Sequence, residues 1–363
     1  MSFMFVRIET LAQSSAEDSE MISGFRHSAI GTGVLLISSV LLFSACSRIH
    51  HLHSELQMDH DHALPANMLN ADPEAQDWAK QRLAKSPRHQ EWVKIKYKPA
   101  GASAEREVSA YVVYPEVKTK TTAVLVIHEI FGMSDWVQSL TDELAEAGYV
   151  AIAPDLLSGM GPNHGGTAEI RTQYSDSNAV GKAIRDLPPD QITADLNAVA
   201  NYVLNLPASN GRIAVTGFCW GGSQSFRYAT NNSKLKAAFV FYGSEPVKED
   251  QKTVDKDALA RINAPVYGFY AGNDARIGAT VPATVDAMKE LKRVYESVSY
   301  EGAGHGFMRA GDAPEPAAPV AKGNAEADKA ATDKYEKDVV AYKANKKARD
   351  EAWARWKAIL AKI

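Results

Sequence analysis

The sequence predicts a doubly wound, mostly parallel α/β sheet flanked by helices. Apolar strand-like runs alternate with runs of helical periodicity between residues 122 and 300, and this alternation is typical of such a sheet. The run 122–128 is continuously apolar, as expected of a central strand that is covered on both faces. Reactive side chains directly follow several of these strands, where sheets of this class hold their ligand sites.

The individual elements follow from their periodicity. Stretches 91–98 and 107–114 alternate apolar and polar residues, which predicts antiparallel strands at a sheet edge. A short helix is expected at 72–85, and Asp190 is a candidate N-cap that follows a pair of prolines. Further strands are expected at 149–154, 213–216, 237–242, 265–271 and 295–300, and further helices at 136–147, 190–203, 224–230 and 280–294.

Three other segments lack this alternation. Residues 158–185 are rich in glycine, asparagine and serine, and we expect them to form a lid or a pocket wall. Residues 311–323 are rich in proline and alanine and are expected to form an exposed loop. Residues 325–363 predict a charged helix whose stripe of Trp353, Trp356 and Leu360 docks onto the sheet.

Composition limits the class of protein. A chain of 363 residues can form one large catalytic domain or two small ones. Hydrophobic residues make up 45% and charged residues 23%, as in an ordinary globular protein, and the net charge of −4 gives no sign of a nucleic-acid partner. The two cysteines, Cys46 and Cys219, do not imply a disulfide framework, so each needs its own explanation.

The N-terminus predicts a targeting segment. An apolar run over 30–45, too short for a comfortable membrane span, ends in Phe-Ser-Ala before Cys46. These residues resemble the lipobox of a bacterial lipoprotein signal, in which the cysteine is lipidated, and Met21 is the start that gives this signal a normal length. We therefore interpret 1–46 as a signal segment, with an uncleaved anchor as the alternative. Both readings place the protein in the bacterial cell envelope on the periplasmic side, and the first makes it lipid-anchored.

Residues 47–70 form a histidine-rich segment. Half of the ten histidines in the chain lie here, interleaved with aspartates. Such a composition can bind Zn²⁺ or Cu²⁺, but no predicted element fixes the geometry of these side chains. We interpret the segment as a tether without a metal site, followed by a single domain over 71–363.

The candidate nucleophile is Cys219. A β-branched run enters the turn Gly217-Phe-Cys-Trp-Gly-Gly222, and a helix can follow it. This is the strand–turn–helix context of a nucleophile elbow, in which the glycines allow strand and helix to approach closely. The thiol then projects from the carboxyl end of the sheet, with the backbone N–H of Trp220 aimed at the same place. The alternative is a buried structural cysteine.

Two further strand ends supply the partners of this thiol. Asp274 follows the strand at 265–271, and His305 follows the strand at 295–300. The order of nucleophile, acid and histidine is that of the α/β-hydrolases. His305 would take the thiol proton, and Asp274 would orient the imidazole and stabilise its charged form. Asn273 is the alternative to Asp274, although an amide cannot supply the charge.

The loop after the central strand reads His128-Glu-Ile-Phe-Gly132. It begins like the zinc motif H-E-x-x-H, but Gly132 replaces the second histidine, so a metalloprotease is excluded. In a hydrolase this loop supplies a second oxyanion donor, here the N–H of Ile130. Glu129 can accept a hydrogen bond from the thiol and act as a base, or it can make only a local hydrogen bond within the loop.

Five short motifs resemble the dienelactone hydrolase family (carboxymethylenebutenolidases) in order and spacing across residues 90–310. The resemblance implies a single-domain α/β-hydrolase without a cofactor and a triad of Cys219, Asp274 and His305. It implies that Glu129 holds the resting thiol and helps to generate the thiolate, and that Ile130 and Trp220 form the oxyanion hole. The motifs are 129–132, 154–156, 217–222, 272–274 and 304–307.

The family also binds its substrate carboxylate with two arginines. Arg309 follows His305 by four positions, as the resemblance requires, and its guanidinium suits a carboxylate. The second arginine falls within 158–185, where Arg171 is the candidate and Arg185 the alternative.

The sequence thus predicts a cofactor-free hydrolase that opens a small-molecule ester or lactone through a thioacyl-enzyme. We expect a monomer with no nucleic-acid partner and with membrane contact only through the N-terminal lipid anchor. The alternatives are a general carboxylesterase or thioesterase with the same triad, and a non-catalytic envelope lipoprotein that uses the fold for binding. A redox role for Cys219 is disfavoured because no second cysteine near it can resolve an oxidised thiol.

Overall fold

The structure, a computed structural model, describes residues 76–174 and 178–363. The described residues all belong to one compact unit. The predictions of a signal segment over 1–46, lipidation at Cys46 and a tether over 47–70 all lie outside the described residues.

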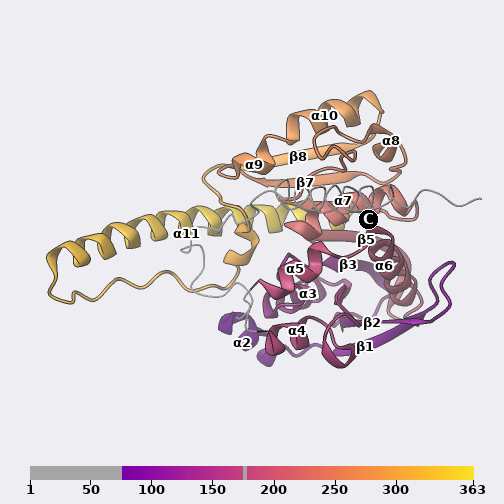
Figure 1. The fold of residues 1–363 in the computed structure, drawn as a ribbon, viewed down its shortest axis with the longest axis horizontal. Coiled ribbons are helices and arrows are strands. Elements are labelled where there is room, and N and C mark those ends of the chain that lie inside the picture. Colours follow the sequence, from indigo (N-terminus) through magenta and orange to yellow (C-terminus); the bar gives the residue numbers. More distant parts are fainter. Residues whose placement is uncertain (1–75, 175–177) are drawn as a thin grey trace, which may run out of the picture. The chain divides into compact units, whose positions relative to one another are not determined.

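An eight-stranded sheet with the order β1-β2-β4-β3-β5-β6-β7-β8 forms the centre of the unit (Figure 1). β1 pairs with β2, and β2 with β4, in antiparallel fashion, whereas every other neighbouring pair is parallel. The predicted class and the antiparallel direction of these two strands are therefore confirmed, but only β1 lies at the sheet edge, because β2 pairs with β4 on its other side. The strands are β1 (Gln90–Tyr97), β2 (Arg106–Val113), β3 (Thr121–Ile127), β4 (Val150–Pro154), β5 (Ser209–Phe218), β6 (Ala237–Phe241), β7 (Val266–Ala271) and β8 (Tyr295–Tyr300).

Helices cover both faces of the sheet and divide the core in two. Along β3, Leu125 and Ile127 pack into the core beneath α5, α6, α7 and α10, whereas Val124 and Val126 pack into the core beneath α3 and α11. This alternation explains why the whole strand is apolar. The helices are α2 (Asp77–Lys85), α3 (Asp135–Glu146), η1 (Pro162–His164), α4 (Thr167–Gln173), α5 (Ala179–Arg185), α6 (Pro189–Leu204), α7 (Trp220–Asn231), α8 (Lys256–Leu259), α9 (Ala275–Gly278), α10 (Val281–Glu290), η2 (Phe307–Ala310) and α11 (Ala325–Leu360).

The predicted docking of the C-terminal helix is confirmed. Trp356 is fully buried, and its ring lies 4.9 Å from that of Phe241 on β6. Leu360 is buried in the same core, and Trp353 packs against it. Buried residues of α11 begin at Asp338, and the part of the helix before this residue runs away from the sheet (Figure 1). No helix within the described ranges combines the length and hydropathy that a membrane span requires.

The start of α6 differs from the prediction. The helix begins at Pro189 with Pro188 as its N-cap, and no side chain caps it. Proline suits the first helical position because its φ is preset and it lacks an N–H that would need an acceptor. Asp190 instead lies in the first turn, where a carboxylate interacts favourably with the positive end of the helix dipole.

The segment 158–185 also contains more structure than its composition predicts. Three short helices, η1, α4 and α5, lie within it. Each buries only one or two apolar side chains or none, such as Val180 and Ile184 of α5. Helices of this length are shorter than the window in which helical periodicity can be detected.

Asp155, at the end of β4, attaches α4 to the rest of the domain. Its carboxylate accepts hydrogen bonds from the backbone N–H of Thr167 at 2.8 Å and from the hydroxyl of Thr167 at 2.7 Å. The Thr167 side chain in turn lies against Gly132, where an added Cβ would stand 2.4 Å from its oxygen. Gly132 has a φ of 68°, so both sterics and backbone conformation require glycine there. The predicted pocket wall is thereby fixed to the loop that contains Glu129.

Candidate active site

Cys219 lies on the tight turn between β5 and α7. Its φ of 55° and ψ of −120° belong to a region that side-chain-bearing residues rarely adopt, at a cost of about 1–3 kcal/mol. Two sets of main-chain bonds hold this conformation. The N–H of Cys219 donates to Phe241 O at 3.1 Å, and Cys219 O accepts from the N–H groups of Gly222 and Ser223 at 3.0 and 3.2 Å.

The glycines around Cys219 are required by close backbone contacts. A Cβ on Gly217 would stand 1.9 Å from Gly221 O, and a Cβ on Gly221 would stand 2.2 Å from His128 O. No side chain fits at such distances, so strand, turn and helix can approach one another only through glycine. The steric interpretation of the Gly-x-Cys-x-Gly-Gly motif is confirmed.

The structure brings Asp274 and His305 together. Asp274 is the N-cap of α9, after β7, and its Oδ2 lies 2.5 Å from His305 Nδ1. Nδ1 therefore carries the proton that the carboxylate accepts, and Nε2 is the ring nitrogen left to meet the thiol. Asn273 is exposed, and its amide donates to Gly302 O at 3.0 Å. The partner of the histidine is thus Asp274 and not Asn273.

Electrostatics favour the charged forms of both partners. Burial lowers the pKa of His305, but the charge of Cys219 and hydrogen bonds to Asp274 and Cys219 outweigh it and raise that pKa to about 9. Burial likewise raises the pKa of Asp274, yet the hydrogen bond and the charge of His305 bring it below its usual value. A raised histidine pKa beside a lowered aspartate pKa is typical of groups that transfer protons in an active site.

Glu129 and Arg309 form a buried ion pair beside the thiol. Arg309 Nη1 lies 2.6 Å from Glu129 Oε2, and each side chain is only 2% exposed. The guanidinium also lies 5.6 Å from the ring centre of Phe131. Both residues are predicted as site residues, but their pairing is not, because they are 180 positions apart and no sequence pattern links them. The side chain of Glu129 therefore has a partner beyond its own loop.

The other predicted arginines lie on the helices of the segment 158–185. Arg171, on α4, donates from Nη2 to Phe131 O at 3.0 Å and is half-buried. Arg185 ends α5 and is exposed. Of the two, Arg171 contacts the loop that contains Glu129, and carboxylate binding by Arg171 or Arg309 stays a prediction.

His128 positions the two predicted oxyanion donors. Its Nδ1 lies 2.8 Å from Glu129 O and its Nε2 accepts from Leu156 N–H at 3.4 Å. This arrangement needs a neutral ring, and burial lowers the pKa of His128 accordingly. The ring stacks on Trp220 at 5.5 Å. Among the described residues, the N–H groups of Ile130 and Trp220 have no main-chain acceptor, so they remain available to an oxyanion.

Sequence reasoning overlooked the roles of His128 and Tyr242. His128 is interpreted only as the start of a failed zinc motif, and Tyr242 only as the end of a strand. Tyr242 is fully buried, and its ring meets that of His305 edge-on at 4.9 Å. The only sequence signal is that each residue directly follows a strand of the parallel part of the sheet, where ligand sites lie.

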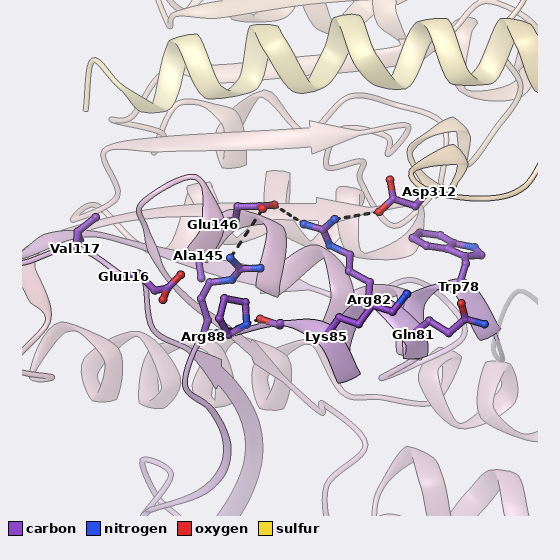
Figure 2. A pocket seen from close by; sticks show the side chains of 12 residues that line it. Trp78, Gln81, Arg82, Lys85, Arg88, Glu116, Val117, Ala145, Glu146 and Asp312 are labelled. Atoms are coloured by element: carbon purple, nitrogen blue, oxygen red, sulfur yellow. Dashed lines mark hydrogen bonds and ion pairs between the residues drawn. The ribbon is translucent and has the colours of Figure 1, made fainter.

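A hollow of about 700 Å³ lies away from this site, between α2 and the end of α3. Figure 2 shows Arg82 between Glu146 and Asp312, with Arg88 and Trp78 nearby. These charged groups bind one another, and none of the predicted site residues lines the hollow. In the described part of the chain, no cluster of three or more histidine, cysteine, aspartate or glutamate side chains has the arrangement of a metal site.

Comparison with known proteins identifies the family. The model of the "Dienelactone hydrolase family" matches residues 108–363. A "Putative carboxymethylenebutenolidase" of Yersinia pestis is 33% identical over 207 residues, which cover 55% of this chain and 74% of that protein. A "Probable 2-oxo-3-(5-oxofuran-2-ylidene)propanoate lactonase" of a Bradyrhizobium species is 27% identical and covers 60% of this chain and 83% of its own.

Solved structures agree with the fold. A "Putative Dienelactone Hydrolase" from Klebsiella pneumoniae superposes with a TM-score of 0.51 at 26% identity, covering 70% of this chain and 98% of that chain. A dienelactone hydrolase-like phosphotriesterase from metagenomic libraries gives a TM-score of 0.52 at 18% identity, covering 75% and 98%, and at this identity it supports the fold alone. This chain belongs to the dienelactone hydrolase family and is a hydrolase with the α/β-hydrolase fold.

Proposed function

We propose that this protein hydrolyses an ester or lactone bond of a small molecule, with Cys219 as the nucleophile and a thioacyl-enzyme as the intermediate. The observation that carries the proposal is the strained Cys219 beside the Asp274–His305 pair. A strained backbone persists where the surrounding fold enforces it, and such strain is concentrated at active sites. A binding protein needs neither the strain nor the paired acid and histidine.

The proposed reaction begins with loss of the thiol proton to Glu129 or His305. The sulfur attacks the carbonyl carbon, and the N–H groups of Ile130 and Trp220 stabilise the oxyanion. The C–O bond then breaks, and the leaving oxygen takes a proton from the His305 imidazolium. Water attacks the thioester while His305 accepts its proton. The C–S bond then breaks, the sulfur regains a proton from His305 or Glu129, and the carboxylic acid is released. Asp274 keeps the Nδ1–H tautomer throughout.

The substrate class rests on the relatives and on the arginines. Relatives carry the names of a carboxymethylenebutenolidase and of a lactonase. Arg309 contacts the ring of Phe131 and Arg171 donates to its carbonyl oxygen, and a guanidinium binds a carboxylate well. A lactone that bears a carboxylate fits this arrangement if Arg309 exchanges Glu129 for the substrate. That exchange would also release Glu129 to take the thiol proton.

A second candidate is a general carboxylesterase or thioesterase with the same triad. It is favoured by the burial of Arg309 and by its ion pair with Glu129, which leave the guanidinium occupied. A substrate without a carboxylate would leave this pair intact. The two candidates share every chemical step and differ only in what Arg309 binds.

The test follows hydrolysis by the full-length protein in detergent, using a dienelactone, neutral lactones and activated esters. Cys219→Ala is expected to lower kcat by at least about 10³-fold on every substrate. Arg309→Lys is expected to raise KM for the carboxylate-bearing lactone alone if that lactone is the substrate. Turnover that survives in Cys219→Ala would overturn the proposal, and native protein inert on every substrate would favour the binding lipoprotein.

We also propose that Cys46 carries a lipid that anchors the protein to the periplasmic side of the cell envelope. The support is the short apolar run before Ser44-Ala45-Cys46. Mass spectrometry of the mature N-terminus should find a diacylglyceryl group on Cys46, and Cys46→Ala should release the protein from the membrane fraction. An unmodified Cys46 within an intact N-terminus would contradict lipidation.

A further inference from the structure

Tyr242 has a backbone conformation that a bulky residue rarely adopts. It directly follows β6 with a φ of 40°, a backbone conformation that is strained for a residue with a side chain. Its N–H donates to Phe269 O at 2.9 Å. The following residue, Gly243, is pressed against α7, since an added Cβ would stand 2.3 Å from Ser223 N. The chain here is held tightly, and the tyrosine side chain is directed into the site.

Aromatic contacts fix the Tyr242 ring beside the catalytic groups. The ring meets His305 edge-on at 4.9 Å and Phe307 edge-on at 5.4 Å. The side chain is 0% exposed. A phenol buried to this degree normally has a hydrogen-bond partner.

The hydroxyl of Tyr242 nevertheless has no partner among the described residues, and neither has Glu129 Oε1. Both atoms are fully buried, so each loses the hydrogen bonds that water would supply, which is unfavourable unless another partner replaces them. The Tyr242 hydroxyl can donate a hydrogen bond, and Glu129 Oε1 can accept one. After burial itself, the charge of Glu129 is the largest influence that raises the pKa of Tyr242. The phenol and the Glu129 carboxylate therefore interact, and each presents a buried polar atom that lacks a partner in the described chain.

We propose that the Tyr242 hydroxyl donates a hydrogen bond to Glu129 Oε1, the oxygen that Arg309 does not bind, and thereby keeps Glu129 a carboxylate that competes less strongly for the proton of the Cys219 thiol. Tyr242 is a positioning residue, because it acts through Glu129 and does not touch the reacting atoms. This inference rests on the proposed role of Cys219 as the nucleophile.

Glu129 and the sulfur of Cys219 compete for one proton, the proton of the thiol. A donor on a carboxylate stabilises its anionic form, so the bond from Tyr242 makes Glu129 a weaker base toward the thiol. Without the hydroxyl, the proton of the thiol moves more readily to Glu129, and a larger fraction of Cys219 is thiolate. The charged and titratable groups that face the phenol are Glu129, Arg309, Cys219 and His305, and only the first of them offers an unpartnered acceptor.

The experiment measures the rate of Cys219 alkylation by iodoacetamide from pH 5 to pH 10 on the full-length protein. Only the thiolate reacts, and the assay needs no substrate. Tyr242→Phe removes the hydroxyl and keeps the ring. We expect it to react about threefold to tenfold faster than native protein at pH 7, with the midpoint shifted to lower pH. A fluorinated tyrosine at position 242, a stronger donor, should react more slowly than native protein.

Two controls separate this role from a structural one. Tyr300→Phe removes another buried hydroxyl without a partner in the described chain, which belongs to β8 and faces Phe307, and it should leave the alkylation profile unchanged. In a Glu129→Gln background, Tyr242→Phe should have no further effect, because the acceptor has lost its charge.

The inference is overturned if Tyr242→Phe matches native protein at every pH, or if its effect survives in the Glu129→Gln background. Either result would leave the proposed hydrolysis untouched, since that depends on turnover. A Cys219 that resists alkylation even at pH 10 would overturn both the inference and the proposed nucleophile.

Discussion

Two buried ion pairs in this domain differ in how completely their carboxylates are bound. Asp195 on α6 accepts hydrogen bonds from Arg106 Nε at 2.7 Å, from Arg106 Nη2 at 2.8 Å and from the Tyr97 hydroxyl at 2.6 Å. Glu129 in the site has only Arg309 on one oxygen, and its other oxygen has no partner in the described chain. Both carboxylates are buried.

The difference reflects what each pair does. A buried carboxylate with both oxygens bound is held in place, which suits the junction of α6 with β1 and β2. A buried carboxylate with only one oxygen bound to a cation is held less firmly, and its other oxygen can accept a proton or a hydrogen bond. Arg106 thus binds both oxygens of Asp195 where the fold needs rigidity, whereas Arg309 binds only one oxygen of Glu129, where the proposed reaction needs a change of partner.

The largest expected effect comes from Glu129→Gln. The amide keeps the shape of the side chain but cannot accept the thiol proton, so kcat/KM for hydrolysis should fall by about 10²-fold or more. Stopped hydrolysis assays between pH 6 and pH 9 measure this. If the variant kept native kcat/KM, Glu129 would be a purely structural partner of Arg309, and the comparison with Asp195 would fail.

Asp195→Asn is the matched change at the fully bound carboxylate. Removing the charge leaves Arg106 without its counter-ion in a mostly buried position, which should lower the free energy of unfolding by about 3 kcal/mol. Urea unfolding monitored by circular dichroism measures this loss. The specific activity of the folded variant should equal that of native protein. A fall in activity of the folded variant would show that Asp195 also acts on the site.

Gly306→Ala tests the support behind Arg309. Gly306 has a φ of 82°, and an added Cβ would stand 2.2 Å from Arg309 Nη2. We expect about 1–2 kcal/mol of backbone strain and displacement of the guanidinium from Glu129, with kcat/KM lowered about ten- to a hundredfold. Gly302→Ala is the control, because Gly302 has a similar φ of 74° but only an ordinary contact with Ala344. Equal losses of activity in both variants would refute a specific role for the Gly306–Arg309 contact.

The smallest effect is the pH dependence of the Asp274–His305 pair. The pKa of His305 in the folded protein is about 9, above the value of about 6.5 in an unfolded chain. The stability that this raised pKa contributes is fully present below pH 6.5 and is lost as the pH rises through 9. Asp274→Asn weakens one cause of the shift, so the difference in unfolding free energy between native protein and this variant should shrink across that window. A difference that stays constant across it would contradict the assigned pKa.

The sheet could be predicted because each strand carries its own local signal. β3 is apolar on both faces, β1 and β2 alternate, and β8 lies where periodicity places it. The short helices α4 and α5 could not be predicted, because their stability comes from contacts such as Asp155 with Thr167 rather than from a repeating pattern. Local patterns reveal an element only when it is long enough to repeat them.

The residues of the candidate site also divide into those that a local sequence pattern reveals and those that it does not. Cys219, Asp274 and His305 were predictable from short motifs at strand ends, because the carboxyl ends of parallel strands meet at one edge. The ion pair of Glu129 with Arg309 and the place of Tyr242 beside Glu129 were not, since they join residues from distant loops through side-chain packing. Such contacts between distant residues leave no motif in the sequence.

The central claim is that Cys219 carries the acyl group of the substrate, and mass spectrometry of the full-length protein tests it most directly. The reaction with an activated ester is stopped in acid during turnover, and the peptide that contains Cys219 is analysed. The account predicts an added mass equal to the acyl group on Cys219, which is absent from Cys219→Ala and accumulates further in His305→Ala, where water is no longer activated. Turnover without any adduct on Cys219, or an adduct on another residue, would contradict it.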